Sequence, residues 1–153
     1  MPPAMTRSII IVLVAVALIG SYILYTNQPP PPDYVAMARP ALVASAAATT
    51  NDDRLTAIIA ATDAYAKIVH EIKDVADAQL ALPELIRLAN EAKRLDDELR
   101  QEPDARRALM ESRRREVDAC AMTMAGMMLS TTLRLEIMKT ILDPTETMAS
   151  TLQ

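Results

Sequence analysis

The stretch CAMTMAGMM, residues 120–128, concentrates the side chains best suited to a soft metal: one cysteine and four methionines. Thiolate and thioether ligands together select Cu(I), and Cys120, Met124 and Met127 recur in steps of three and four, on one face of a helix. The same positions continue an apolar stripe along the flanking sequence, and methionine and free cysteine commonly fill helical cores. We therefore interpret the stretch as the packed middle of a long helix and assign it no metal.

The single histidine belongs to a second candidate for metal binding, the stretch HEIKDVAD. On a helix, His70, Asp74 and Asp77 would share one face, a spacing that zinc or copper sites use. Such a site needs a further ligand from elsewhere, and acidic residues on an exposed helical face are usually solvated. We therefore predict no metal and no cofactor. We also predict no enzyme, because any Ser–His–Asp set would have to use His70 itself.

The composition favours an all-α fold. Apolar residues make up 51% of the 153, yet Phe and Trp are absent, Tyr occurs four times and Gly twice. Strands favour aromatic and β-branched residues, and tight hairpins need glycine. The net charge of −4 gives no general attraction to phosphate backbones. The arginines of residues 106–115 alternate with acids that can pair with them along a helix, so we predict no nucleic-acid partner.

The amino-terminal segment SIIIVLVAVALIGSYILY, residues 8–25, carries no charge. At about 1.5 Å per residue it covers roughly 27 Å as a helix, close to the hydrocarbon thickness of a bilayer. Its length and the lack of a small-x-small cleavage site favour an uncleaved single-pass anchor in residues 1–27, in contact with membrane lipid, over a signal peptide. Arg7 flanks its near end, which favours a cytoplasmic amino terminus and a periplasmic or otherwise extracytoplasmic remainder.

Residues 28–50 are predicted to be a proline- and alanine-rich linker. The four consecutive prolines of NQPPPPD lack amide donors and favour the extended polyproline conformation, so we expect a short, stiff spacer. The alanine-rich stretch that follows has the composition of a short helix starting at Pro40, a residue that suits a first helical turn.

Residues 51–143 carry three apolar stripes with the three- and four-residue spacing of helices that pack lengthwise. They predict a coiled-coil-like helical hairpin or a three-helix bundle. Pro83 marks either a turn or a kink, and the third stripe predicts one helix of about 38 residues that ends near Asp143. Residues 144–153 are predicted to be a flexible tail. The stripes are Leu55, Ile58, Thr62, Tyr65, Val69, Ile72, Ala76 and Gln79; Leu85, Leu88, Ala92, Leu95 and Leu99; and Met110, Arg113, Val117, Cys120, Met124, Met127, Thr131, Leu135, Met138 and Leu142.

These features predict a single-pass, membrane-anchored helical scaffold or accessory subunit of a membrane-associated assembly. It would act by protein–protein interaction and form homo- or hetero-oligomers through its helical seams. The anchor placed first, the helical remainder, the small size and one non-membrane cysteine, Cys120, resemble the layout of the inner-membrane subunit of phage spanins. That resemblance implies a lysis protein of the inner membrane. A third hypothesis is an anchored periplasmic metal sensor or chaperone that uses His70, Asp74, Cys120 and Met124.

Overall fold

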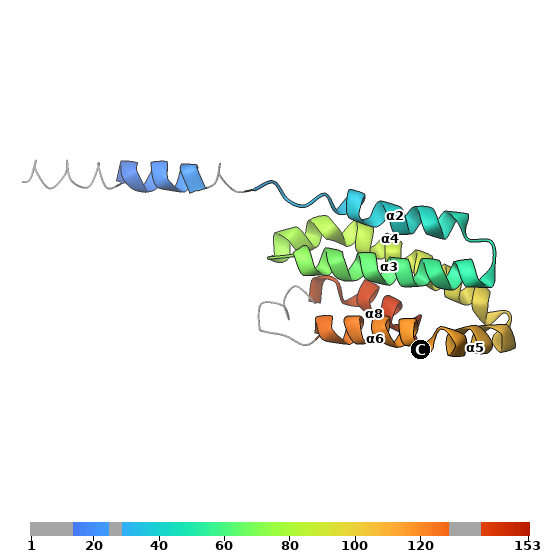
Figure 1. The fold of residues 1–153 in the computed structure, drawn as a ribbon. Helices are drawn as coiled ribbons and strands as arrows, with labels where there is room; N and C mark the ends of the chain where they lie inside the picture. The colour runs from blue at the N-terminus through green and yellow to red at the C-terminus, as the bar shows by residue number, and fades with distance from the viewer. Residues whose placement is uncertain (1–13, 25–28, 129–138) are drawn as a thin grey trace, which may run out of the picture. The chain divides into compact units, whose positions relative to one another are not determined.

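The computed structural model of the chain describes residues 14–24, 29–128 and 139–153 (Figure 1). All regular structure in these ranges is helical, which confirms the all-α class. The chain divides into two compact units, Met1–Pro31 and Pro32–Gln153.

The first unit holds a helix over residues 14–24, within the predicted anchor. The Ser21 hydroxyl donates a hydrogen bond to the carbonyl of Ala17 at 2.8 Å, one turn earlier. The other parts of the predicted anchor, residues 1–13 and 25–27, lie outside the described residues. Among the residues that the structure describes, no helix is long and apolar enough to cross a bilayer.

The second unit begins with α2 (Tyr34–Ala47), where a linker was predicted. Residues 29–33 are non-helical, as four consecutive prolines require. Asp33 then caps the helix, because its carboxylate accepts a hydrogen bond from the backbone N–H of Ala36 at 2.9 Å. The inward side of α2 is buried, and its small alanines let it approach its neighbours closely, so this stretch belongs to the core. The buried residues of α2 are Tyr34, Ala38, Ala41 and Ser45.

Helices α3 (Asn51–Glu71) and α4 (Val75–Arg100) form the hairpin that the first two stripes predict. A capping box starts α3: the Thr50 hydroxyl accepts from the N–H of Asp53, whose carboxylate accepts from the N–H of Thr50. The chain then turns at residues 72–74, and Asp74 caps α4 by accepting from the N–H of Asp77. The first stripe was predicted to continue beyond this turn, and that was wrong. Ala76 and Gln79 are exposed.

Pro83 makes no turn, because α4 continues through it to Arg100. Proline has no N–H, so the carbonyl of Gln79 loses its usual helical donor. Both residues are exposed, which leaves that carbonyl open to water. The second stripe is confirmed beyond this point. Its buried members are Leu85, Leu88, Ala92, Leu95 and Leu99.

The predicted long third helix is broken at Arg113, so that prediction was wrong. Helix α5 (Pro103–Ser112) ends there and α6 (Arg114–Met128) begins, because Arg113 has φ −110° and ψ 21°. Its guanidinium donates to the Thr56 hydroxyl at 2.7 Å and forms ion pairs with Asp52 at 3.3 Å and Glu116 at 2.5 Å. These bonds fix the α5–α6 joint against the first turns of α3. The part of the predicted helix in residues 129–138 lies outside the described residues.

The predicted flexible tail is instead α8 (Leu142–Ser150), a helix that closes the core. Met148 is completely buried in it. The Tyr65 and Thr145 hydroxyls are 2.5 Å apart, and the Thr145 hydroxyl donates to the carbonyl of Ile141 at 2.9 Å. Tyr65 is therefore the donor to Thr145. Burial raises the pKa of Tyr65 to about 12, so this phenol stays protonated.

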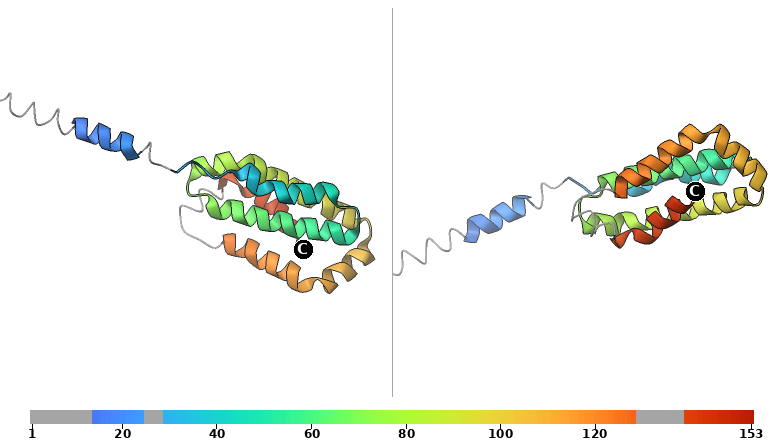
Figure 2. Two further views of the ribbon diagram at one scale, coloured as in Figure 1. Left: turned by 45° about the horizontal axis from the view of Figure 1, so that its top comes forward. Right: turned by 90° about the horizontal axis from the view of Figure 1, so that it is seen from below.

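Helices α3 and α4 lie at the centre of the second unit (Figures 1 and 2). Helix α2 packs against both of them, while α6 packs against α3 and α8 against α4. Most described members of the predicted seams face the interior of a bundle that has more helices than the predicted hairpin or three-helix bundle; Ala76, Gln79 and Leu142 are exposed.

Two apolar clusters form the core. Alanine, leucine and isoleucine side chains of α2, α3 and α4 make up most of them; α6 adds Val117 and Met124, and α8 adds Met148. Leu109 and Met110 of α5 are partly buried against the second cluster.

Candidate functional site

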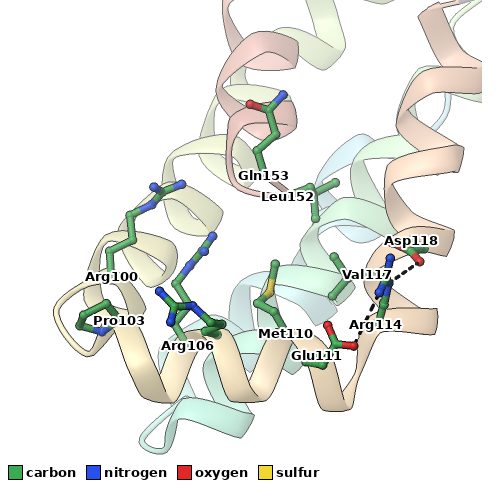
Figure 3. Close-up of a pocket in the computed structure, with 11 residues that line it drawn as sticks. Arg100, Pro103, Arg106, Met110, Glu111, Arg114, Val117, Asp118, Leu152 and Gln153 are labelled. Atoms are coloured by element: carbon green, nitrogen blue, oxygen red, sulfur yellow. Dashed lines mark ion pairs between the residues drawn. The ribbon is translucent and has the colours of Figure 1, made fainter.

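A groove of about 600 Å³ lies where α4, α5 and α6 meet the last residues of the chain (Figure 3). Its apolar surface comes from Met110, Val117 and Leu152, and its remaining lining is strongly charged. Its charged lining residues are Arg100, Arg106, Arg107, Glu111, Arg114 and Asp118. An open surface with guanidinium groups beside apolar side chains suits a protein segment that carries both carboxylates and apolar residues.

A buried carboxylate, Asp96, holds two of these arginines in place. Only 6% of its side chain is exposed. Arg100 Nε donates to its Oδ2 at 2.6 Å, and Arg106 Nε donates to its Oδ1 at 3.0 Å. Arg106 Nη2 is also 3.0 Å from Oδ1, an ion-pair contact whose geometry is not that of a hydrogen bond. The hydrogen bond and charge of Asp96 raise the pKa of Arg100, so this guanidinium stays charged. Asp96 therefore links the end of α4 to α5.

The outer arginines of the groove are held more loosely. Arg107 is 3.8 Å from Asp104, and Arg114 is 3.6 Å from both Glu111 and Asp118. These contacts confirm the predicted pairing along the helix, and Figure 3 shows those of Arg114. Both guanidinium groups are mostly exposed, so each pair contributes about 0–1 kcal/mol at most. A partner's carboxylate can therefore replace these acids at little cost.

The structure separates the three residues predicted to share one helical face. His70 lies near the end of α3, Asp74 lies in the turn and Asp77 lies in α4. The carboxylates are already used, because Asp74 accepts from the N–H of Asp77 at 2.9 Å and Asp77 accepts from the N–H of Lys73 at 3.2 Å. The prediction that these three residues share one helical face was wrong, because α3 ends after His70 and Asp74 caps the next helix. Within the described ranges, no three His, Cys, Asp or Glu side chains are placed to hold a metal ion.

The Met-rich stretch is placed only in part as the core interpretation predicts. On α6, Cys120 is 4% exposed and Met124 is 3% exposed, while Met127 is half-buried and Met122 is 75% exposed. Burial, and then the charges of Asp63 and Glu116, raise the pKa of the Cys120 thiol to about 11. At neutral pH this cysteine is therefore a neutral thiol inside the core rather than a thiolate ligand.

Alkylation of Cys120 is expected to be slow in the folded chain. Its pKa rises from 9.0 to about 11, so at pH 8 the folded state holds about one hundredth of the thiolate that an unfolded chain holds, before steric protection is counted. Iodoacetamide labelling at pH 8, with and without denaturant, measures this directly, because Cys120 is the single cysteine. Equal labelling rates in the two states would contradict the placement of Cys120.

A second open pocket, of about 500 Å³, lies among α2, α3 and α6. Met37, His70 and Met127 each line it, one from each helix. Two of these were candidates from the sequence. Met37 was missed because its segment was predicted to be a linker. The sequence did contain a signal for Met37. It lies three residues after Tyr34 and one before Ala38, a spacing that places it at the edge of a helical stripe.

Comparison with protein-family models, with curated proteins and with solved structures found no match to this chain. Its function is therefore inferred from the groove, the pocket and the amino-terminal helix.

Proposed function

We propose that this chain is a membrane-anchored helical scaffold, an accessory subunit that binds a partner protein and catalyses no reaction. The observation that carries the proposal is the helix over residues 14–24. Leu18 is 65% exposed and Leu24 is 73% exposed, and this uncharged helix exposes apolar side chains in successive turns. Leaving such a surface in water is unfavourable, and lipid would cover it. The neighbouring uncharged residues of the segment 8–25 supply the length that a bilayer requires.

The proposed orientation places Arg7 in the cytoplasm and the helical bundle on the other side of the membrane. Arg7 is the single charge before Asp33, and positive charge is retained on the cytoplasmic side of single-pass helices. The prolines at 29–32 are non-helical, and consecutive prolines favour the stiff, extended polyproline conformation that suits a spacer.

The proposed partner surface is the arginine groove. The stripes that the sequence offers for self-association are largely buried inside the bundle, whereas the groove is open. Guanidinium groups bind carboxylates in a bidentate manner, and Met110 and Leu152 provide apolar contact beside them. An acidic, amphipathic segment of a partner fits this chemistry.

Replacing Val16 and Ile19 with aspartate is expected to move the chain from the membrane fraction to the soluble fraction. Each aspartate at the centre of a spanning helix costs about 2.5–3.5 kcal/mol of insertion free energy. Carbonate-washed membranes and the supernatant are compared by immunoblot. The matched control replaces Val35 and Val43, two exposed valines of α2, with aspartate and should stay with the membrane. A wild-type chain found in the supernatant would refute the anchor.

Reversing the charge of Arg107 and Arg114 together is expected to release the partner. Both arginines are mostly exposed, so Arg107→Glu with Arg114→Glu should leave the fold intact while removing two carboxylate-binding groups. The partner is measured by its stoichiometry after co-purification from native membranes. The control, Lys73→Glu with Lys93→Glu, changes the net charge equally at exposed sites outside the groove. Equal partner recovery with both double variants would exclude the groove.

A further inference from the structure

Two thioethers and one imidazole line the pocket among α2, α3 and α6. Met37 comes from the first turns of α2, His70 from the last turn of α3 and Met127 from the end of α6. These residues are 33 or more positions apart in the sequence, so the bundle itself gathers them. From this arrangement we infer that the pocket is a Cu(I) site, with the Sδ atoms of Met37 and Met127 and a ring nitrogen of His70 as ligands.

The ligand types select the metal. Thioether sulfur is a soft, neutral donor that favours Cu(I), and imidazole binds copper as well. Zinc and the hard divalent cations prefer thiolate, imidazole or several carboxylates, and the lining of this pocket offers a single carboxylate, that of Glu71. A monovalent cation also suits the local charge, because Lys67 and Glu71 on the lining cancel one another.

The methionines differ in how accessible they are. Met124 and Met148, inside the core, are 3% and 0% exposed. Met37 and Met127 pack against the edge of the main apolar cluster, but they are only half-buried and both line the pocket. A thioether at the wall of an open cavity is accessible to an incoming ion, whereas one in a close-packed core is not.

The other walls of the pocket suit a low-coordinate ion. Ala66, Val69 and Gly126 contribute small apolar surfaces. The Thr123 hydroxyl, also on the lining, donates to the carbonyl of Ala119. With Glu71 as the one carboxylate on the lining, the pocket offers few oxygen ligands, and this favours Cu(I), which is stable with two or three soft ligands, over Cu(II). The site lies outside the arginine groove and shares no lining residue with it, so the two functions are independent.

The test is a titration of the full-length chain in detergent micelles with Cu(I), under anaerobic conditions and in competition with a chromophoric Cu(I) chelator. One equivalent is expected to bind. Met37→Leu, Met127→Leu and His70→Gln should each weaken binding by about tenfold or more. Met122→Leu is the matched control, because Met122 lies on α6, is 75% exposed and does not line the pocket. Its affinity should equal that of the wild type.

A second measurement reports on the ligands themselves. With methyl-labelled methionine and Ag(I) as a redox-inert substitute, the methyl resonances of Met37 and Met127 should shift at one equivalent while that of Met122 stays in place. Circular dichroism of each variant separates loss of a ligand from loss of the fold. The inference is overturned if no Cu(I) is taken from the chelator, or if Met37→Leu and Met127→Leu bind as the wild type does. It is also overturned if Cys120→Ala alone abolishes binding.

Discussion

Replacing Asp96 with alanine should lower the free energy of unfolding by about 3–5 kcal/mol, the cost of breaking a buried ion pair by removing one partner. Asp96 is buried and forms ion pairs with both Arg100 and Arg106. The side chain of Arg106 is only 16% exposed, so the substitution leaves a largely buried guanidinium without its carboxylate. Arg100 is half exposed and contributes little to the effect, because water can solvate it instead.

Urea unfolding of the full-length chain, followed by circular dichroism, measures this difference. The neighbouring Asp97 provides the control. It is 57% exposed and pairs with Lys93 at 3.2 Å, so Asp97→Ala should cost less than about 1 kcal/mol. Similar losses from the two variants would show that Asp96 is not the link between α4 and α5. Because Asp96 positions Arg100 and Arg106, Asp96→Ala should also weaken partner binding at the groove.

Truncating Leu88 to alanine should cost about 2–5 kcal/mol of unfolding free energy, as expected for a fully buried leucine. Leu88 is 0% exposed within the main apolar cluster. The cost combines the lost transfer free energy of the side chain with the cavity that remains. The same measurement tests the register of α4 beyond Pro83, because a turn at Pro83 would change which residues face the core.

Ile86 is the matched control for Leu88. It lies two positions earlier on the same helix, on the outward side, and is 41% exposed. Ile86→Ala should cost less than about 1 kcal/mol, because the residue buries less surface and leaves no cavity. If Ile86→Ala were the more destabilising of the two, the helix would have a different register after the proline.

The apolar stripes predicted the core faces well, because helical periodicity is a local property of the sequence. Leu55, Leu88, Leu99 and Met124 are all buried where the spacing places them. The all-α class could be predicted from composition alone, since the scarcity of glycine and aromatic residues disfavours sheets along the whole chain.

Helix ends were predicted less well, because two kinds of sequence signal mark them: residues that break helices, such as proline, and side chains that cap them. Pro83 indicates an interruption, yet a continuous helix tolerates it because Pro83 and Gln79, whose carbonyl loses its donor, are both exposed. The real turn, at residues 72–74, contains neither proline nor glycine. Its signal was Asp74 followed three residues later by Asp77, a capping pattern that an unbroken stripe concealed.

The errors at α2 and α8 have a common physical cause. Neither helix has a strong apolar stripe of its own, since alanine dominates the first and threonine and proline interrupt the second. Tertiary contacts stabilise them, and such contacts are not visible in local patterns. Arg113 was placed in a stripe by spacing alone, but its bonds to Asp52 and Thr56 hold it at a break between helices.

Neither the groove nor the pocket could be predicted as a unit. The sequence showed the arginines near residue 106, but not that Asp96 would hold two guanidinium groups at the bundle end. It showed His70 and Met127, but their approach to Met37 depends on how three helices pack. Sites assembled from distant segments become visible only once the packing is known.

The position of α8 after α3 and α4 in the chain determines when this fold can be completed. Tyr65 and Thr145, whose hydroxyls join α3 to α8, are 80 residues apart. While the ribosome is still translating α8, the faces of α3 and α4 that it later covers remain in contact with water. Nascent chains with such apolar surface recruit chaperones and are prone to aggregate. The proposed anchor, in contrast, precedes the bundle in the chain and leaves the ribosome before it, so membrane targeting would precede closure of the bundle.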